Sequence, residues 1–215
     1  MKEKEEVEVK FYVSNFDDKL RKRVENIKPE MQHIGSKLEK NILFDDQEGS
    51  LKRKGKILRL RRWRGENTLT FKGPKMKSKF KRRPESEVKV DNFQETKRIL
   101  NKLGFRKYMR YEKRREKFKF RLDENKLEVC FDKMPYGNFV EIEGNENDIP
   151  RVAGKLGFNW ENRIVEDYIK IFENLRKERN LNFSDLTFKN FTKVNPKKLK
   201  FQEFIRGYSQ SPKEF

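Results

Sequence analysis

The sequence is poor in the residues that most often carry out nucleophilic or zinc chemistry. Its 215 residues include one cysteine and one histidine. Disulfides, zinc clusters and Cys/His or Ser/His catalysis therefore have almost nothing to work with. Any chemistry has to use carboxylates, lysine, arginine or tyrosine.

Long apolar stretches are also absent. No run approaches the roughly 18 apolar residues that a membrane span needs, and the N-terminal segment MKEKEEVEVKFYV lacks the apolar core of a signal peptide. We therefore expect a soluble, cytoplasmic protein that has no membrane partner.

Charge is what the sequence has in excess. Lys+Arg number 54 against 35 for Asp+Glu, charged residues make up 41% of the chain, and the formal net charge is +19. Hydrophobic residues make up only 33%, which raises the question of disorder. Leu, Ile, Val and Phe nevertheless account for about a quarter of the chain, above the level typical of disordered proteins. We expect a folded core.

Alternation of apolar and charged residues predicts a mainly antiparallel sheet. The runs cover residues 7–13, 56–63, 67–72, 85–90, 107–120, 126–131 and 139–143, and turn formers separate them. Helical spacing predicts helices over 16–27, 93–103, 149–156 and 163–179. The segment through Pro29 and Gly35 is expected to be a loop.

The composition changes near residue 180. We expect one domain over residues 1–180, followed by a basic C-terminal extension over 181–215. The extension is polar with scattered phenylalanines, and it is expected either to be partly disordered or to drape over the domain through its aromatic residues. These are Phe188, Phe191, Phe201 and Phe204.

The charged residues of each run share one parity and therefore one face of the strand. For a single strand, the simplest interpretation is a solvated outer face. Seven such strands favour another interpretation, in which the sheet closes, helices cover its apolar side, and the charged faces line the interior. That interior would hold Glu6, Glu8, Glu85, Glu87, Asp132, Glu141 and Glu143 together with Lys10, Arg59, Arg61, Lys72, Lys113 and Arg115.

This mixture of charges predicts a metal-bridged polyphosphate as the ligand. Carboxylate oxygens without His or Cys select Mg²⁺ or Mn²⁺. Arginine forks and lysine ammonium groups bind phosphate oxygens. A nucleoside triphosphate is the simplest ligand that uses both kinds of group.

The same residues resemble a known family. EVEVK at 6–10 is similar to the ExExK signature of the CYTH superfamily, the triphosphate tunnel metalloenzymes. Further blocks resemble, in order, those of class IV adenylate cyclase-like members. They are LKRKGKILRLR (51–61), LTFKGP (69–74), RPESEV (83–88), LGFRKYMRYEKRREKF (103–118), FDKMPYGNFVEIEG (131–144) and LGF (156–158), followed by the EDYIKIF helix.

The resemblance implies a fold of the α+β class. It is a closed eight-stranded antiparallel β tunnel, with helices packed on the outside. This agrees with the assignment of strand faces. Seven strands are evident in the sequence, and the eighth is not.

The resemblance also implies roles for the charged residues. The metal-binding carboxylates would be Glu6, Glu8, Asp132, Glu141 and Glu143. The phosphate ligands would be Lys10, Arg59, Arg61, Lys72, Lys113 and Arg115. Glu85 and Glu87 would either support neighbouring bases or bind metal, and Lys72 is also a candidate catalytic residue.

The first expected reaction is conversion of ATP to cyclic AMP and pyrophosphate, with hydrolysis of inorganic triphosphate or thiamine triphosphate as the alternative. The net charge leaves open a non-catalytic protein that binds polyphosphate or nucleic acid, although exposed paired glutamates would repel nucleic acid. The sequence does not name the triphosphate. It allows a homodimer without locating an interface.

Overall fold

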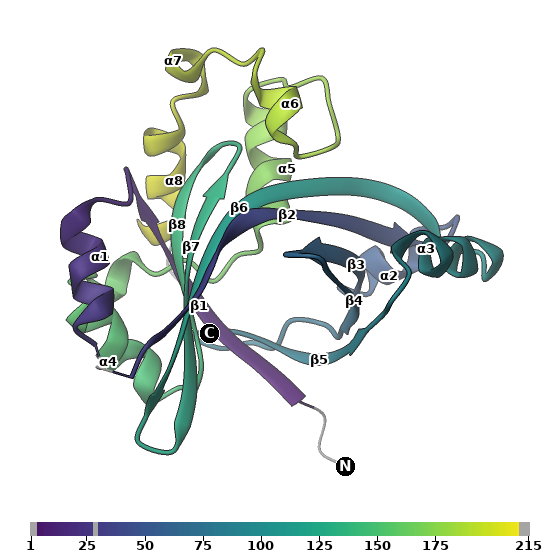
Figure 1. Ribbon diagram of the computed structural model, residues 1–215. Helices are drawn as coiled ribbons and strands as arrows, with labels where there is room; N and C mark the ends of the chain where they lie inside the picture. Colours follow the sequence, from purple (N-terminus) through teal and green to yellow (C-terminus); the bar gives the residue numbers. More distant parts are fainter. Residues whose placement is uncertain (1–3, 28–29, 211–215) are drawn as a thin grey trace.

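A computed structural model describes residues 4–27 and 30–210. Eight antiparallel strands close into a barrel in the order β1-β5-β4-β3-β2-β6-β7-β8, seen as a ring in Figure 1. The strands are β1 (Lys4–Val13), β2 (Gln32–Asp45), β3 (Ile57–Trp63), β4 (Glu66–Lys72), β5 (Lys81–Lys89), β6 (Arg106–Leu122), β7 (Asn125–Met134) and β8 (Gly137–Glu143). The expected eight-stranded fold is confirmed.

The strand that the sequence pattern did not reveal is β2. The prediction of a loop around Gly35 was wrong, because β2 pairs with β6 through this segment and pairs with β3 further on, from Lys40 to Phe44. Two features hide it: Leu43 and Phe44 are adjacent and both buried, and the register is irregular between His33 and Gly35. Pro29 of the expected loop lies outside the described residues.

The start of β5 was also missed. The strand begins at Lys81, whereas the alternation predicted a start at residue 85. Pro84 lies inside the strand and cannot donate to a neighbouring strand, although its carbonyl accepts from the Gly73 amide at 2.8 Å. The proline therefore interrupts the sequence pattern of a strand that continues on both sides of Pro84.

The helices lie outside the barrel. They are α1 (Asp18–Glu25), α2 (Ser50–Arg53), α3 (Phe93–Lys102), α4 (Asp148–Lys155), η1 (Trp160–Asn162), α5 (Tyr168–Glu178), α6 (Phe188–Phe191), α7 (Pro196–Leu199) and α8 (Phe201–Gln210). Helix α5 starts later than the predicted 163, because Ile164 forms a β-bridge with Lys10 instead.

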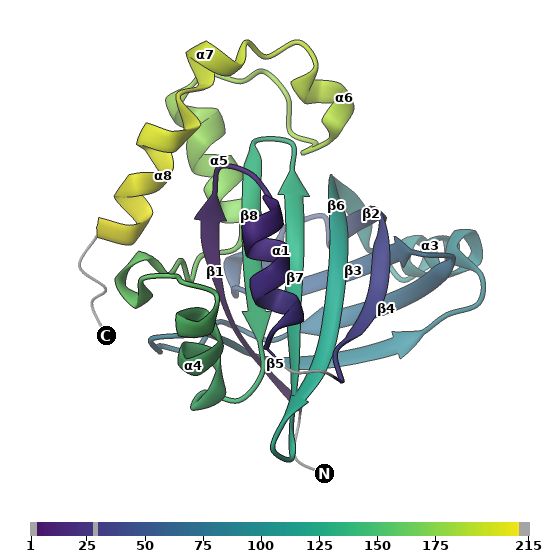
Figure 2. The ribbon, with the colours of Figure 1, turned by 60° about the vertical axis from the view of Figure 1, so that its left-hand side comes forward.

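The apolar faces of the strands pack against these helices. Helices α1 and α4 cover β1, β7 and β8 in Figure 2, where Leu20 and Val152 join Val129 and Ile142 in one core. Helix α3 packs elsewhere, over Phe44 of β2 and Leu60 of β3. Because the apolar residues face outward to the helices, the alternate, charged residues face the interior.

The chain beyond residue 180 packs against the same molecule. Leu186, Leu199, Phe201 and Ile205 are buried in one cluster with Phe172 of α5. Leu186 also forms a parallel bridge with β6. Residues 211–215 of the expected extension lie outside the described residues, and a domain boundary at 180 stays a prediction.

No helix in the described part of the chain is long and apolar enough to span a membrane.

Candidate active site in the barrel

The interior of the barrel holds a cavity of about 530 Å³. Most of the residues predicted for the site line it: Glu6, Glu8, Arg59, Arg61, Lys72, Glu85, Glu87, Lys113, Arg115, Glu141 and Glu143. The other two, Lys10 and Asp132, are fully buried and lie behind this lining. The strand faces predicted from the sequence therefore meet in one place.

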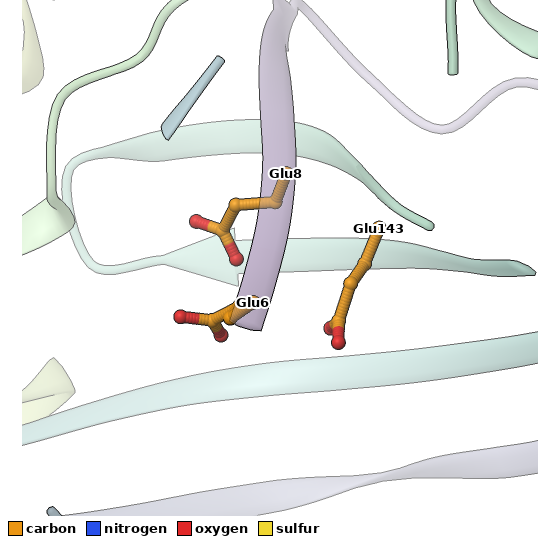
Figure 3. A group of neighbouring side chains, drawn as sticks. All are labelled: Glu6, Glu8 and Glu143. Atoms are coloured by element: carbon orange, nitrogen blue, oxygen red, sulfur yellow. The ribbon is translucent and has the colours of Figure 1, made fainter. Parts of the chain in front are cut away.

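Three carboxylates form the candidate metal centre. Glu6, Glu8 and Glu143 each offer an oxygen within 4.8 Å of the others, and Figure 3 shows them on the neighbouring strands β1 and β8. Burial, with the charges of Glu6, Glu128 and Glu8, raises the pKa of Glu143 to about 8. Within the described part of the chain, the Glu143 carboxylate has neither a hydrogen bond nor an ion pair.

Lys72 lies against this trio. Its Nζ is 2.5 Å from both carboxylate oxygens of Glu6 and 3.4 Å from Glu85. Burial alone would raise the pKa of Glu6, but Lys72 and Lys81 hold it well below its usual value. Burial raises the pKa of Glu85, and Lys72 only partly opposes this. Lys72 therefore binds one candidate metal ligand directly.

Two of the three arginines of β3, Arg59 and Arg61, line the cavity and are held by neighbours on β4 and β5. Glu87 lies 3.1 Å from Arg61 and 3.6 Å from Arg59. It also accepts a hydrogen bond from Thr70 at 2.8 Å, and Arg59 donates to that hydroxyl at 3.3 Å. Burial would raise the pKa of Glu87, but Arg61 and Thr70 lower it. Glu87 therefore organises the two arginine forks.

Asp132 is surrounded by donors. It accepts from Arg115 at 2.7 and 2.5 Å, from Lys113 at 3.0 Å, and from the Tyr168 hydroxyl at 3.0 Å. Arg115 also donates to Glu141 at 2.6 Å. Burial opposes ionisation of Glu141, yet Arg115 and Lys113 hold its pKa well below the usual range. Asp132 and Glu141 therefore lie outside the trio. Asp132 contacts Arg115 and Lys113, and Glu141 contacts Arg115.

Several charged residues of the interior were not predicted. Glu39 of β2 is buried 3.7 Å from Lys113 and accepts from Asn41 at 3.0 Å. One oxygen of Glu39 has no hydrogen-bond partner among the described residues. Burial would raise the pKa of Glu39, but Lys113 and Arg115 keep it low. Recognition of β2 as a strand would have placed Glu39 on the inner face.

Lys81, Arg83 and Asp167 form a second unpredicted group. Lys81 lies 2.7 Å from Glu8 and 3.0 Å from Asp167, and Arg83 lies 2.7 Å from the other Asp167 oxygen. Lys81 and Arg83 share parity with Glu85, so extending the strand across the proline would have found them. No periodic signal marks Asp167, which precedes the first residue of α5.

An apolar group borders the charged lining beside Arg59. Leu43 is opposite Arg59 in the β2–β3 ladder, and Ile57 precedes it on the same face. The Tyr111 hydroxyl accepts from Arg59 at 3.3 Å. These residues, with Ile169, line the same cavity. The cavity therefore offers both charged and apolar contacts.

The chain is similar to proteins of a known family. The CYTH domain family model matches residues 4–156. A protein of Methanocaldococcus jannaschii named "Putative adenylate cyclase MJ0240" is 30% identical over 172 residues, which cover 79% of this chain and 89% of that protein.

Two solved structures share the fold. The PH1819 protein of Pyrococcus horikoshii has a TM-score of 0.60 at 24% identity, covering 79% of this chain and 98% of its own. A Vibrio parahaemolyticus protein, titled a putative adenylate cyclase, has a TM-score of 0.65 at 20% identity, covering 80% and 99%. The family match spans well over half of the residues and includes all eight barrel strands, and on this ground the chain belongs to the CYTH domain family.

Proposed function

We propose that this protein is a Mg²⁺- or Mn²⁺-dependent enzyme that acts on a triphosphate held inside the barrel. One observation carries the proposal: a single cavity joins a cluster of arginines and lysines to a carboxylate trio whose member Glu143 has no partner in the described chain. An anion site alone would not need the trio. A metal site alone would not need the bases.

The trio fits a hard divalent cation. Its ligands are carboxylate oxygens, which Mg²⁺ and Mn²⁺ prefer. A cation would also counter the burial and the carboxylate repulsion that together raise the pKa of Glu143. Glu6, Glu8 and Glu143 would hold the ion, and Asp132 and Glu141 would position bases. When bound, the ion supplies a Lewis acid that neutralises phosphate charge.

The bases of the cavity would hold the phosphate chain. Arg59, Arg61 and Arg115 present planar forks suited to phosphate oxygens, and Glu87 and Asp132 fix their orientation. Lys72 and Lys113 add point charges. Such groups stabilise charge that develops on phosphate oxygens during transfer. We assign Lys72 this electrostatic role, and no nucleophilic side chain is required.

Cyclisation of ATP is the reaction we favour. In it, the ribose 3′-hydroxyl attacks the α-phosphorus, and pyrophosphate leaves. Two observations support this choice: the relative from Methanocaldococcus jannaschii carries an adenylate cyclase name, and Leu43, Ile57 and Tyr111 provide apolar contacts that a nucleoside can use. Inorganic triphosphate would leave these contacts without a partner.

Hydrolysis is the second candidate. Charged side chains dominate the lining and recognise only the phosphate chain, which ATP, inorganic triphosphate and thiamine triphosphate share. In hydrolysis, water attacks the terminal phosphorus, the bond from that phosphorus to the bridging oxygen breaks, and the remaining diphosphate leaves. Orthophosphate is the other product. The same bases would serve either reaction.

Product analysis tests the proposal. Purified protein is incubated with Mg²⁺ or Mn²⁺ and, separately, with ATP, inorganic triphosphate or thiamine triphosphate. Cyclic AMP with pyrophosphate is the expected result. Glu8→Gln should abolish turnover, whereas Lys77→Gln, which changes an exposed lysine shortly before β5, should not.

Other products have distinct meanings. Release of orthophosphate without cyclic AMP would show that the protein is a triphosphatase and not a cyclase. Tight triphosphate binding without turnover would indicate a non-catalytic polyphosphate-binding protein, and would contradict the proposed enzyme.

A further inference from the structure

Lys81 makes the shortest contact to the candidate metal ligand Glu8. Its Nζ lies 2.7 Å from Glu8 Oε1. Lys10 approaches the same oxygen at 3.3 Å, and its Nζ also donates to the backbone carbonyl of Glu166 at 2.8 Å. The ammonium group of Lys81 therefore occupies a position beside Glu8 that a metal ion would have to share or take.

Asp167 holds the same ammonium group from the other side. Its Oδ1 lies 3.0 Å from Lys81 Nζ, and its Oδ2 lies 2.7 Å from Arg83 Nη2. Arg83 is itself fixed, because its Nη1 donates to the carbonyls of Gly55 at 2.8 Å and Gly73 at 3.0 Å. Asp167 is thus an anchored second partner that keeps Lys81 inside the barrel when Glu8 is engaged elsewhere.

We propose that Lys81 is a positioning residue of the metal centre, a built-in counter-ion that competes with the metal for Glu8, and that Asp167 sets the strength of this competition. The inference rests on the metal-dependent function proposed above. A cation and an ammonium group that share one carboxylate repel each other at short range. Asp167 keeps the ammonium group of Lys81 paired when the metal displaces it from Glu8.

The contacts predict opposite effects of two substitutions. Lys81→Gln removes the competing charge, so it should tighten Mn²⁺ binding about tenfold. Asp167→Asn leaves Lys81 with Glu8 as its main partner, so it should weaken Mn²⁺ binding by a similar factor. The effect of Asp167→Asn should vanish in the Lys81→Gln background, because there is then no ammonium group to hold.

Mn²⁺ binding is measured without substrate, by electron paramagnetic resonance of the free ion. Lys77→Gln is the matched control, since it removes one positive charge from an exposed lysine four residues before Lys81 and should leave the affinity unchanged. Lys81→Arg keeps the charge and should bind Mn²⁺ nearly as the unsubstituted protein does. It also provides a reference if Lys81→Gln does not fold.

The outcomes separate the two proposals. If the unsubstituted protein binds Mn²⁺, and Glu8→Gln abolishes binding, the metal centre stands. The role of Lys81 would then be overturned by unchanged or weaker binding in Lys81→Gln, or by an effect of Asp167→Asn that persists in the double variant. If the unsubstituted protein binds no Mn²⁺, the metal-dependent function fails together with the inference.

Discussion

At the residue scale, Glu143 is the carboxyl of the trio that no base contacts in the described part of the chain. It is paired in register with Glu8 on one side and Glu128 on the other, so three glutamates lie abreast across β1, β8 and β7. Lys81 binds Glu8, while Lys117 and Lys119 bind Glu128. The central carboxyl has no such partner in the described chain, and burial together with the neighbouring glutamates raises its pKa to about 8.

Without bound metal, we expect Glu143 to make the stability of the fold depend on pH. The pKa of Glu143 is about 8 in the folded protein, against 4.5 ordinarily. Below pH 4.5 the group is protonated in both states. Between 4.5 and 8 the unfolded chain loses a proton that the folded protein keeps, so the free energy of unfolding falls as pH rises. Relative to Glu143→Gln, the unsubstituted protein should lose about 2 to 4 kcal/mol over this window.

Urea unfolding in EDTA from about pH 5 to about pH 9 measures this difference. Adding Mg²⁺ should restore stability to the unsubstituted protein and not to Glu143→Gln. Parallel pH profiles of the two proteins in EDTA would show that Glu143 ionises normally.

We expect the buried carboxylate of Asp132 to stabilise the fold by neutralising bases. Because it neutralises Arg115 and Lys113, Asp132→Asn should destabilise the fold by about 3 to 5 kcal/mol. Tyr168→Phe removes one hydrogen bond to the same carboxylate and should cost only about 1 kcal/mol. Urea unfolding of both variants gives the comparison, and equal effects would contradict it.

Mn²⁺ binding tests whether Asp132 is a metal ligand like Glu6, Glu8 and Glu143. Under conditions where Asp132→Asn remains folded, it should still bind Mn²⁺, whereas Glu8→Gln should not. Loss of Mn²⁺ binding in folded Asp132→Asn would restore Asp132 as a metal ligand.

At the scale of elements, the C-terminal helices behave as part of the barrel's packing. Phe201 of α8 is 7% exposed, and its ring packs near Tyr12, Tyr136 and Phe139. Tyr168 at the start of α5 reaches Asp132 inside the barrel. The chain beyond the family match thus supports the site that the strands build.

Phe201→Ala should therefore destabilise the protein by about 3 to 5 kcal/mol through the cavity it leaves. Phe71→Ala is the matched control, because Phe71 is 40% exposed on β4 and should cost much less. The two are compared by urea unfolding. A small effect at Phe201 would mean that α8 packs loosely and that residues 181–210 are a separable extension.

At the scale of the whole molecule, two charge distributions coexist. The net charge is +19, yet the cavity mixes acids and bases that pair with one another. The excess positive charge therefore lies mainly outside the cavity. A surface of this kind attracts any polyanion by releasing its counter-ions.

We predict weak, salt-sensitive binding of duplex DNA that is independent of the barrel. Affinity measured by fluorescence anisotropy should fall steeply between about 50 and 200 mM salt, and Glu8→Gln should leave it unchanged. A large change of DNA affinity in Glu8→Gln, together with absent triphosphate turnover, would favour the nucleic-acid-binding alternative.

The sequence by itself determined the barrel and most of its interior. Period-2 alternation fixes which residues of a strand share a face, so Glu6, Glu8, Arg59 and Glu143 could be assigned to one side before any contact was known. Helical spacing likewise identified α1, α3 and α4 near their observed positions. These signals are local. They can be read from the sequence because one face of a strand contacts only the apolar core and the other face contacts only the barrel interior.

Only the tertiary structure decided which charges meet. Glu39 lies on a strand whose apolar residues occupy both parities, and Lys81 lies beyond a proline that interrupts its pattern. Asp167 comes from a segment far from β5 in the sequence and contacts Lys81 and Arg83 through side-chain ion pairs. Pairing of this kind depends on barrel closure and helix docking, which bring distant residues together without leaving a periodic trace in the chain.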